Sequence, residues 1–248
     1  MTMTKEAIQY LMEQGILPKD RLVKFGKERL LAFDNNGIAQ EIFPNVFNAQ
    51  EALEINTLSG FVNYIKAHID RRGMPLIAHI KNESQVFLRG PINIDGSREV
   101  LAVAQAITPD FRFNNFIDTE SFNIALQSKF LPNDDRQILL QVVGNVSEED
   151  IKNTGDDGVS QAVTINQGIA SKADVKVPNP VTLAPYRTFL EVDQPKSKFV
   201  FRMTTGPKGA IFEADGGAWR NQAIVNIREY LKMELEEEIK LNRIIILA

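Results

Sequence analysis

The chain has 248 residues, of which 44% are hydrophobic and 24% charged, and its formal net charge is -4 at pH 7. This length and hydrophobic content predict a folded protein with a sizeable core and exclude a disordered or fibrous one. The absence of cysteine excludes disulfides, thiolate nucleophiles and cysteine-ligated metal sites. The negative net charge excludes a globally basic surface, so any nucleic-acid contact requires a local basic patch.

The first residues of the chain carry no signal for membrane insertion. Residues 1–10 include Lys5 and Glu6 among apolar residues, without the long apolar run that a signal peptide or a membrane span needs. We therefore expect no membrane partner and a cytoplasmic location.

The first 150 residues alternate between helical and strand-like patterns. An Asn-Gly step at Asn36 between two apolar runs is typical of a β-hairpin, and Gly73 and Pro75 are expected to end a helix with a regular apolar stripe. The elements expected in chain order are a helix over 4–17, hairpin strands over 21–33 and 37–43, a helix over 57–72, a meander of strands over 76–81, 85–92 and 98–107, and a helix pair over 119–130 and 134–144.

The rest of the chain reads as a mostly antiparallel sheet with a long covering helix. The expected strands are 159–168, 173–177, 186–192, 199–203 and 210–214, followed by a helix over 219–238 and an apolar final strand over 243–248. A polar stretch near residues 150–157 predicts a boundary between an N-terminal α+β subdomain, 1–150, and a β-rich C-terminal subdomain, 151–248, although one continuous domain also fits. The predicted fold class is therefore α+β, with the final strand inserted in a sheet or paired between subunits.

Few residues offer catalytic chemistry. His68 and His79 are the two histidines of the chain, and each lies in an apolar helix or strand pattern that favours a structural or surface role. The sequence lacks phosphate-binding glycine loops, nucleophile elbows and zinc-protease motifs. Residues 204–209, the most glycine-rich stretch between two strands, are expected to form a hairpin turn. The common enzyme classes thus have no support in the sequence.

Four acidic residues are the one candidate catalytic set. Glu191 and Asp193 are two residues apart in an expected strand, and Glu213 and Asp215 repeat this spacing near the end of another. If those strands pair, the carboxylates could hold Mg²⁺, which prefers oxygen ligands. The alternative is that all four are solvent-facing residues of an antiparallel sheet, because the lysine usual in such nuclease sites does not follow at that spacing.

A basic strand is the main candidate for nucleic-acid contact. Phe199, Phe201 and Met203 are expected on its buried face, and Lys196, Lys198 and Arg202 on its outer face. An aromatic and basic run begins at Phe111, Arg112 and Phe113 and continues to Phe116. Its side chains could stack bases and contact phosphates beside the basic strand. The alternative is that the cations protect a strand edge from aggregation.

Several short segments from Val159 onward resemble a family of phage and prophage proteins of unknown function that includes the YfdQ proteins. The likeness covers residues 158–231, and the segments that carry it are 158–161, 177–181, 185–192 and 212–219. The resemblance implies a phage-encoded accessory protein of the host-cell cytoplasm, and it supplies no catalytic residues.

The sequence therefore favours a non-catalytic binding protein without a cofactor that engages a host or phage macromolecule, with counter-defence as one role. Two alternatives are open: a single-stranded nucleic-acid binder, and a Mg²⁺-dependent nucleic-acid enzyme. The apolar final strand also predicts a homo-oligomer.

Overall fold

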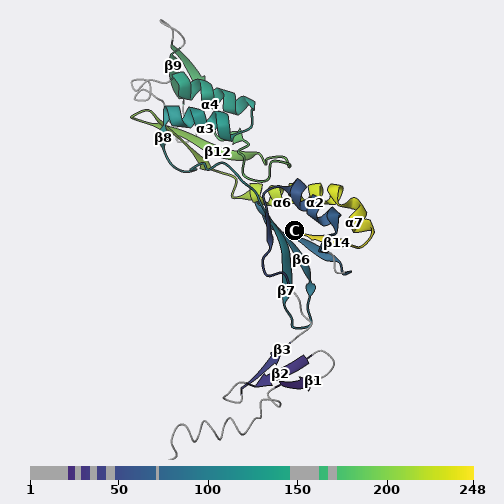
Figure 1. Cartoon of the computed structure of the whole chain (residues 1–248). Helices are drawn as coiled ribbons and strands as arrows, with labels where there is room; N and C mark the ends of the chain where they lie inside the picture. The colour runs from purple at the N-terminus through teal and green to yellow at the C-terminus, as the bar shows by residue number, and fades with distance from the viewer. Residues whose placement is uncertain are drawn as a thin grey trace, which may run out of the picture. The chain divides into compact units, whose positions relative to one another are not determined.

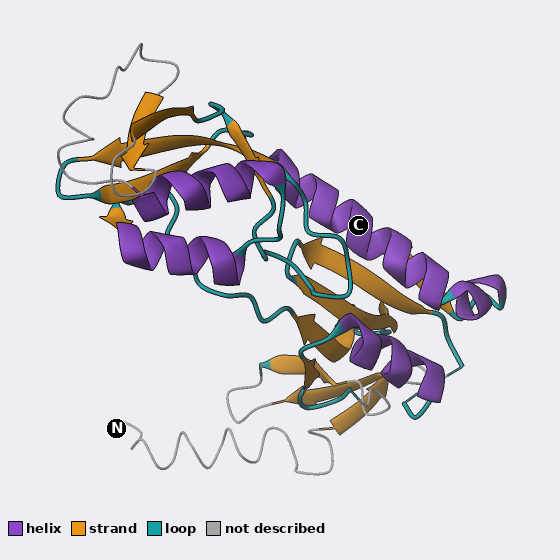
Figure 2. Ribbon diagram, turned by 90° about the horizontal axis from the view of Figure 1, so that it is seen from above, coloured by secondary structure: helices purple, strands orange, loops and turns teal. Residues whose placement is uncertain are grey.

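The computed structural model of the chain describes residues 22–25, 29–33, 38–42, 48–70, 73–145, 162–166 and 172–248. They form an α+β fold in which most strands pair antiparallel (Figures 1 and 2), which confirms the predicted fold class. The chain divides into two compact units, one of residues 1–51 with 90–99 and one of residues 52–89 with 100–248. The boundary expected near residue 150 falls on residues outside the described ranges.

The first unit contains a small antiparallel sheet. Its strands are β1 (Leu22–Phe25), β2 (Arg29–Phe33) and β3 (Ala39–Ile42), in the order β1-β2-β3. The pairing of Phe33 with Ala39 confirms the predicted hairpin, whereas the single strand predicted over 21–33 is two strands. The helix predicted over 4–17 and the Asn-Gly turn lie outside the described residues.

A five-stranded sheet in the second unit is covered on one face by helices. Its order is β14-β5-β6-β7-β4, and the pairings of β14 with β5 and of β4 with β7 are parallel. Side chains from the strands and from helices α2 and α6 form one apolar core on that face, around Phe61, Leu88 and Leu231. The strands are β4 (Leu53–Ile55), β5 (Leu76–Asn82), β6 (Gln85–Ile92), β7 (Arg98–Gln105) and β14 (Ile244–Leu247).

Helix α2 (Leu58–Ala67) is shorter than the sequence predicted. The side chain of Thr57 caps its start by accepting a hydrogen bond from the backbone N–H of Gly60 at 3.1 Å. The helix ends at His68, whose φ of 53° is left-handed, rather than at Gly73. Ile69, which was expected on the apolar stripe, is 75% exposed, so this part of the prediction is wrong.

A four-stranded antiparallel sheet forms the other large layer of this unit. Its order is β11-β12-β13-β8, and helices α3 and α4 cover one face through a core around Phe122, Leu139 and Phe201 (Figure 1). The helix pair agrees with prediction, but the short strands β8 and β11 were missed. The elements are β8 (Ile117–Asp118), α3 (Thr119–Lys129), α4 (Asp134–Asn145), β11 (Val181–Leu183), β12 (Ser197–Thr204) and β13 (Lys208–Glu213).

The remaining elements are a hairpin and the C-terminal helices. Strands β9 (Ala162–Asn166) and β10 (Lys172–Lys176) pair with each other as a two-stranded sheet. The long helix predicted over 219–238 is two helices, α6 (Ala218–Glu234) and α7 (Glu236–Lys240), with a break at Leu235. The final strand β14 lies at one end of the five-stranded order, so it is not inserted between strands. Within the described residues, no helix is both long and apolar enough to span a membrane.

Residues 186–192 form a loop, so the strand predicted there is wrong. The buried side chain of Gln194 accepts hydrogen bonds from the backbone N–H groups of Arg187 and Thr188, at 2.9 and 3.2 Å. It also donates to the carbonyl of Phe189 at 2.9 Å. One buried amide therefore satisfies the backbone groups that a neighbouring strand would otherwise have paired.

Candidate nucleic-acid interface

Strand β12 alternates as predicted. Phe199, Phe201 and Met203 are buried in the core beneath α3 and α4, whereas Lys198 is exposed and Arg202 half-buried on the opposite face. Lys196, just before the strand, is exposed as well. The cations predicted to share a face therefore do so, and they lie on the side of the sheet away from the two helices.

Strand β13 adds a lysine and an aromatic ring to this outer face. The register sets Val200 opposite Phe212 and Thr204 opposite Lys208. Phe212 and Lys208 therefore project on the same side as Lys198 and Arg202. Along β12, positions 198 and 204 are about 20 Å apart at the usual rise of a strand. The outer face thus carries cations at both ends, with an aromatic residue between them.

The aromatic run before β8 is divided between the two faces of the sheet. Phe111 and Phe113 pack against the core, and the Phe113 ring stacks on Phe199 with centroids 5.4 Å apart. Phe116 instead meets Phe212 edge to face, with centroids 5.9 Å apart, and is 42% exposed. The base-stacking role assigned to Phe111 and Phe113 therefore fits Phe116 better, because its ring is accessible.

Three lysines on or beside the outer face lack an ion pair with the described residues. Lys196, Lys198 and Lys208 form no ion pair with any described residue. The one carboxylate beside them in the register is Asp118, opposite Lys208. Hydrogen bonds from Ser121 lower the pKa of Asp118, which caps the start of α3. We call Phe116, Lys198, Arg202, Lys208 and Phe212 the outer-face platform. Arg112, which was predicted with this set, is exposed in the loop before it.

The four acidic residues predicted as a Mg²⁺ site lie in two different places. Glu191 accepts hydrogen bonds from the backbone N–H and the hydroxyl of Ser59, both at 3.3 Å, at the start of α2. Asp193 is exposed, whereas Glu213 and Asp215 lie beside Arg187. Within the described ranges, no three acidic or histidine side chains gather closely enough to hold a metal ion. The loop at 186–192 is the reason, because Glu191 and Asp193 do not share a strand face.

Two of the segments on which the sequence resemblance was based, 185–192 and 212–219, meet around Arg187. This largely buried guanidinium lies 3.0 Å from the carboxylate of Glu213 and 3.9 Å above the ring of Trp219, and it donates to the hydroxyl of Ser197. Burial lowers the pKa of Arg187 to about 10, although the charges of Glu213 and Asp215 oppose the shift. The side chain therefore stays charged at neutral pH and joins the loop to β12, β13 and α6.

A cavity of about 380 Å³ lies beside this cluster, between Phe111, Tyr186, Lys129 and Trp219. Its volume is in the range of small-ligand sites. The guanidinium of Arg187, the one arginine among the residues that line the cavity, already donates to Glu213 and Ser197. We therefore assign Arg187 to the stability of the fold, a role that the sequence did not reveal because its partners lie 10 to 32 positions along the chain.

Asp215 supports the same cluster through the start of α6. Burial raises the pKa of its carboxyl, but hydrogen bonds from Gly217, Ser197 and Trp219 and the charge of Arg187 outweigh burial, so the pKa falls below the ordinary 3.8. A lowered pKa means that the carboxylate stabilises the fold fully above about pH 4 and that this contribution is lost as pH falls further.

We expect Asp215→Asn to lower the free energy of unfolding by about 1 kcal/mol at pH 7, because the charge at a helix N-terminus and beside Arg187 is lost. Urea unfolding at pH 7 and at pH 3 measures this. The difference between wild type and variant should shrink at pH 3, and an undiminished difference there would contradict the assigned charge effect.

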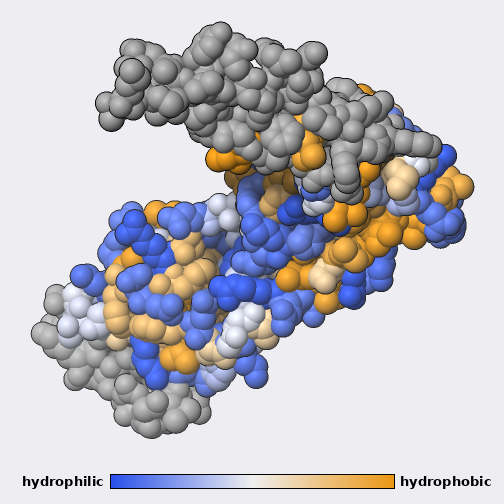
Figure 3. Space-filling model, turned by 90° about the horizontal axis from the view of Figure 1, so that it is seen from below, coloured by the Kyte–Doolittle hydropathy of each residue, from blue (hydrophilic) through white to orange (hydrophobic). Residues whose placement is uncertain are grey.

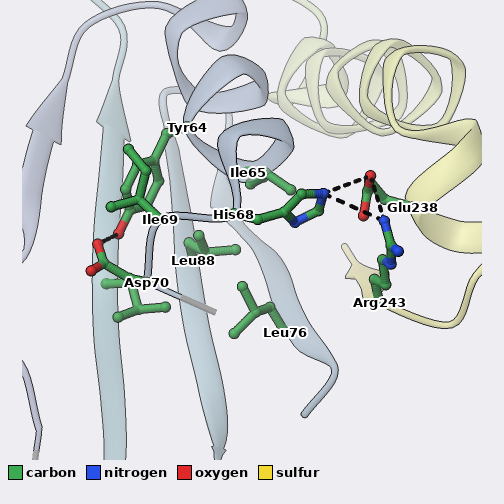
Figure 4. A pocket seen from close by; sticks show the side chains of 10 residues that line it. Tyr64, Ile65, His68, Ile69, Asp70, Leu76, Leu88, Glu238 and Arg243 are labelled. Atoms are coloured by element: carbon green, nitrogen blue, oxygen red, sulfur yellow. Dashed lines mark hydrogen bonds and ion pairs between the residues drawn. The ribbon is translucent and has the colours of Figure 1, made fainter. Parts of the chain in front are cut away.

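His68 has a buried carboxylate partner, Glu238, but no room for a substrate beside it. Figure 4 shows its ring facing Glu238, with His68 Nε2 at 3.3 Å from Oε1 and Arg243 at 3.5 Å from the same oxygen. In the same view Tyr64 donates to Asp70 at 2.5 Å. The cavity they line measures about 20 Å³, which is little more than one water molecule occupies. These contacts join the end of α2 to α7, and His79 lies half-buried on β5.

Comparison with protein-family models, with curated proteins and with solved structures gives no match for this chain.

Proposed function

We propose that this protein is a non-catalytic binding protein that holds single-stranded nucleic acid on the outer-face platform. The observation that carries the proposal is the arrangement of cations and of one exposed aromatic ring, Phe116, on one face of a four-stranded antiparallel sheet. Helices cover the other face of this sheet. Sheets of this kind bind single strands by stacking bases on aromatic rings and by pairing phosphates with cations.

The chemistry of the platform favours a single strand over a duplex. An unpaired base can stack on the exposed ring of Phe116, whereas the bases of a duplex are already stacked on one another. Lys198 and Lys208 lie at opposite ends of the platform and would attract the flanking phosphates. The total charge of the chain is negative, so this attraction is local and should be sensitive to salt.

The biological setting is part of the same proposal. The resemblance of residues 158–231 to phage and prophage proteins supports an accessory protein encoded by a phage and acting in the host cytoplasm. A host or phage protein as the partner is the competing outcome. It would be favoured if the purified protein bound no nucleic acid.

The stacking role of Phe116 provides the test. We expect Phe116→Leu, which keeps an apolar side chain but loses the ring, to weaken binding of a fluorescein-labelled oligothymidine by roughly 5- to 100-fold. Phe116→Trp should restore the affinity, because it restores a ring. Fluorescence anisotropy measures both.

Ile124→Leu is the matched control, since Ile124 is an exposed apolar residue of α3, on the helical side of the same sheet. Equal affinities for Phe116→Leu, Phe116→Trp and the control would refute the stacking role.

A further inference from the structure

Strand β14 offers an unprotected sheet edge. It is the first strand in the order β14-β5-β6-β7-β4, so no described strand lies on its other side. The strand at the opposite end, β4, has three residues and carries the exposed Glu54, features that discourage pairing with another chain. The sequence of β14, Ile-Ile-Ile-Leu, contains no charge and no proline. This edge therefore lacks the usual protection against a further strand.

The backbone of β14 shows which groups point outward. The N–H of Leu76 in β5 donates to the carbonyl of Arg243 at 2.9 Å, and Ile244 lies opposite Leu76 in the parallel register. In a strand, alternate residues direct their N–H and C=O groups to opposite sides. Arg243 and Ile245 therefore bond toward β5, whereas the peptide groups of Ile244 and Ile246 point to the open edge.

Apolar side chains are exposed along the same strand. Ile244 and Ile246 face the core beneath α6, but Ile245 and Leu247 project from the opposite face and are 51% and 49% exposed. Figure 3 shows that hydrophobic residues gather in patches on the surface rather than spread evenly. A groove of about 470 Å³ also follows the edge, between Ile239, Ile244 and Ile246. Both the backbone and the side chains of this edge thus lack a partner among the described residues.

From this arrangement we infer that β14 pairs antiparallel with β14 of a second copy of the chain, about a twofold axis at Ile246. Two antiparallel residues exchange hydrogen bonds only where both direct their N–H and C=O groups toward the other strand. The peptide groups of Ile246 point to the open edge, so Ile246 can pair with Ile246 of the second copy. In this register Ile245 lies opposite Leu247 of the second copy, and Leu247 lies opposite Ile245 of the second copy. Each exposed apolar side chain is therefore covered by another. The two five-stranded sheets join into one continuous sheet of twice the width.

The charges beside the edge also favour a second copy as the occupant. The groove is lined by charges of both signs, those of Lys232, Lys240 and Glu236. Lys240 already pairs with Glu236 at 2.8 Å, so a twofold axis brings a patch of balanced charge against itself, whereas a strongly charged partner would meet like charges. This inference is independent of the nucleic-acid proposal, because it concerns a different sheet.

The experiment uses the absence of cysteine from the chain. In the inferred register, the variant Ile245→Cys mixed with the variant Leu247→Cys should form a disulfide-linked dimer under mild oxidation. Each variant alone should cross-link at least ten-fold less, because Ile245 does not face Ile245 of the second copy. Light scattering of the untreated wild type should give twice the monomer mass.

A second pair of variants tests the apolar contact. We expect Ile245→Lys with Leu247→Lys to give a monomer whose circular dichroism is unchanged, while Ile124→Lys on α3 leaves the dimer intact. A wild type that is monomeric at about 100 μM would overturn the inference, because a dimer with a micromolar Kd is assembled at that concentration. A dimer that survives the lysine pair, or cross-linking as strong in Ile245→Cys alone as in the mixture, would overturn the inferred register and edge.

Discussion

Replacing Arg187 with alanine is expected to reduce the free energy of unfolding by about 3 kcal/mol, the largest loss for any single substitution considered. The change leaves Glu213 without its cation and removes the guanidinium that lies against Trp219, Phe113 and Phe199. For a chain of this size the loss corresponds to a decrease in Tm of about 6 to 12 °C. Thermal unfolding followed by circular dichroism measures it.

Arg220→Ala is the matched control. Arg220 also lies over the Trp219 ring, at 4.9 Å, and it pairs with Glu83 at 3.6 Å, but half of its side chain is exposed. Solvent screening limits such a pair to about 1 kcal/mol or less. If both variants lost the same stability, Arg187 would be an ordinary surface cation and its role in joining the loop to β12 and β13 would be wrong.

The sequence correctly predicted the elements in which apolar residues recur on one face of a strand or helix. The meander of β5, β6 and β7 and the helix pair α3 and α4 agree with their apolar periodicity. The alternation of β12 was also predicted correctly, because the buried Phe199, Phe201 and Met203 alternate with the less buried Lys198, Val200 and Arg202. In these segments the local pattern and the tertiary packing require the same structure.

The errors arose where an individual side-chain contact, rather than apolar periodicity, decides the structure. Residues 186–192 alternate like a strand, yet Gln194 occupies their backbone groups and leaves them as a loop. Helix α2 ends at His68, whose ring meets Glu238 from the far end of the chain. Apolar periodicity does not encode such hydrogen-bond partners, and the loop at 186–192 is why the predicted acidic site did not form.

The candidate interface was predicted in part. Lys198 and Arg202 follow from alternation, but the choice of Phe116 over Phe111 and Phe113 does not. The three phenylalanines differ in their contacts with the sheet, since Phe113 stacks on Phe199 in the core and Phe116 meets Phe212 on the outer face. Lys208 was missed because only the register of β13 places it on this face.

Reversing the charges at both ends of the platform should have the largest effect on binding. We expect Lys198→Glu with Lys208→Glu to weaken the affinity for oligothymidine roughly 100-fold at low salt, because two phosphate contacts become repulsive. Both side chains are exposed and lack ion pairs within the described residues, so the fold should be unaffected. Anisotropy titrations at 50 mM salt measure the affinity.

Lys66→Glu with Lys81→Glu is the control of equal net charge. Both lysines are exposed, on α2 and β5, and they lie neither on the sheet that carries the platform nor in the groove beside β14. Because net charge alone would act equally in both double variants, an equal loss of affinity would show that the platform is not the binding surface.

The most direct measurement is a salt titration of wild-type binding to labelled single-stranded and double-stranded oligonucleotides of the same length. We predict that the single strand binds more tightly and that its association constant falls with salt, with a logarithmic slope of about -2 if Lys198, Arg202 and Lys208 neutralise roughly three phosphates. Binding that is independent of salt, a preference for the duplex, or no binding at low salt would contradict the proposed function.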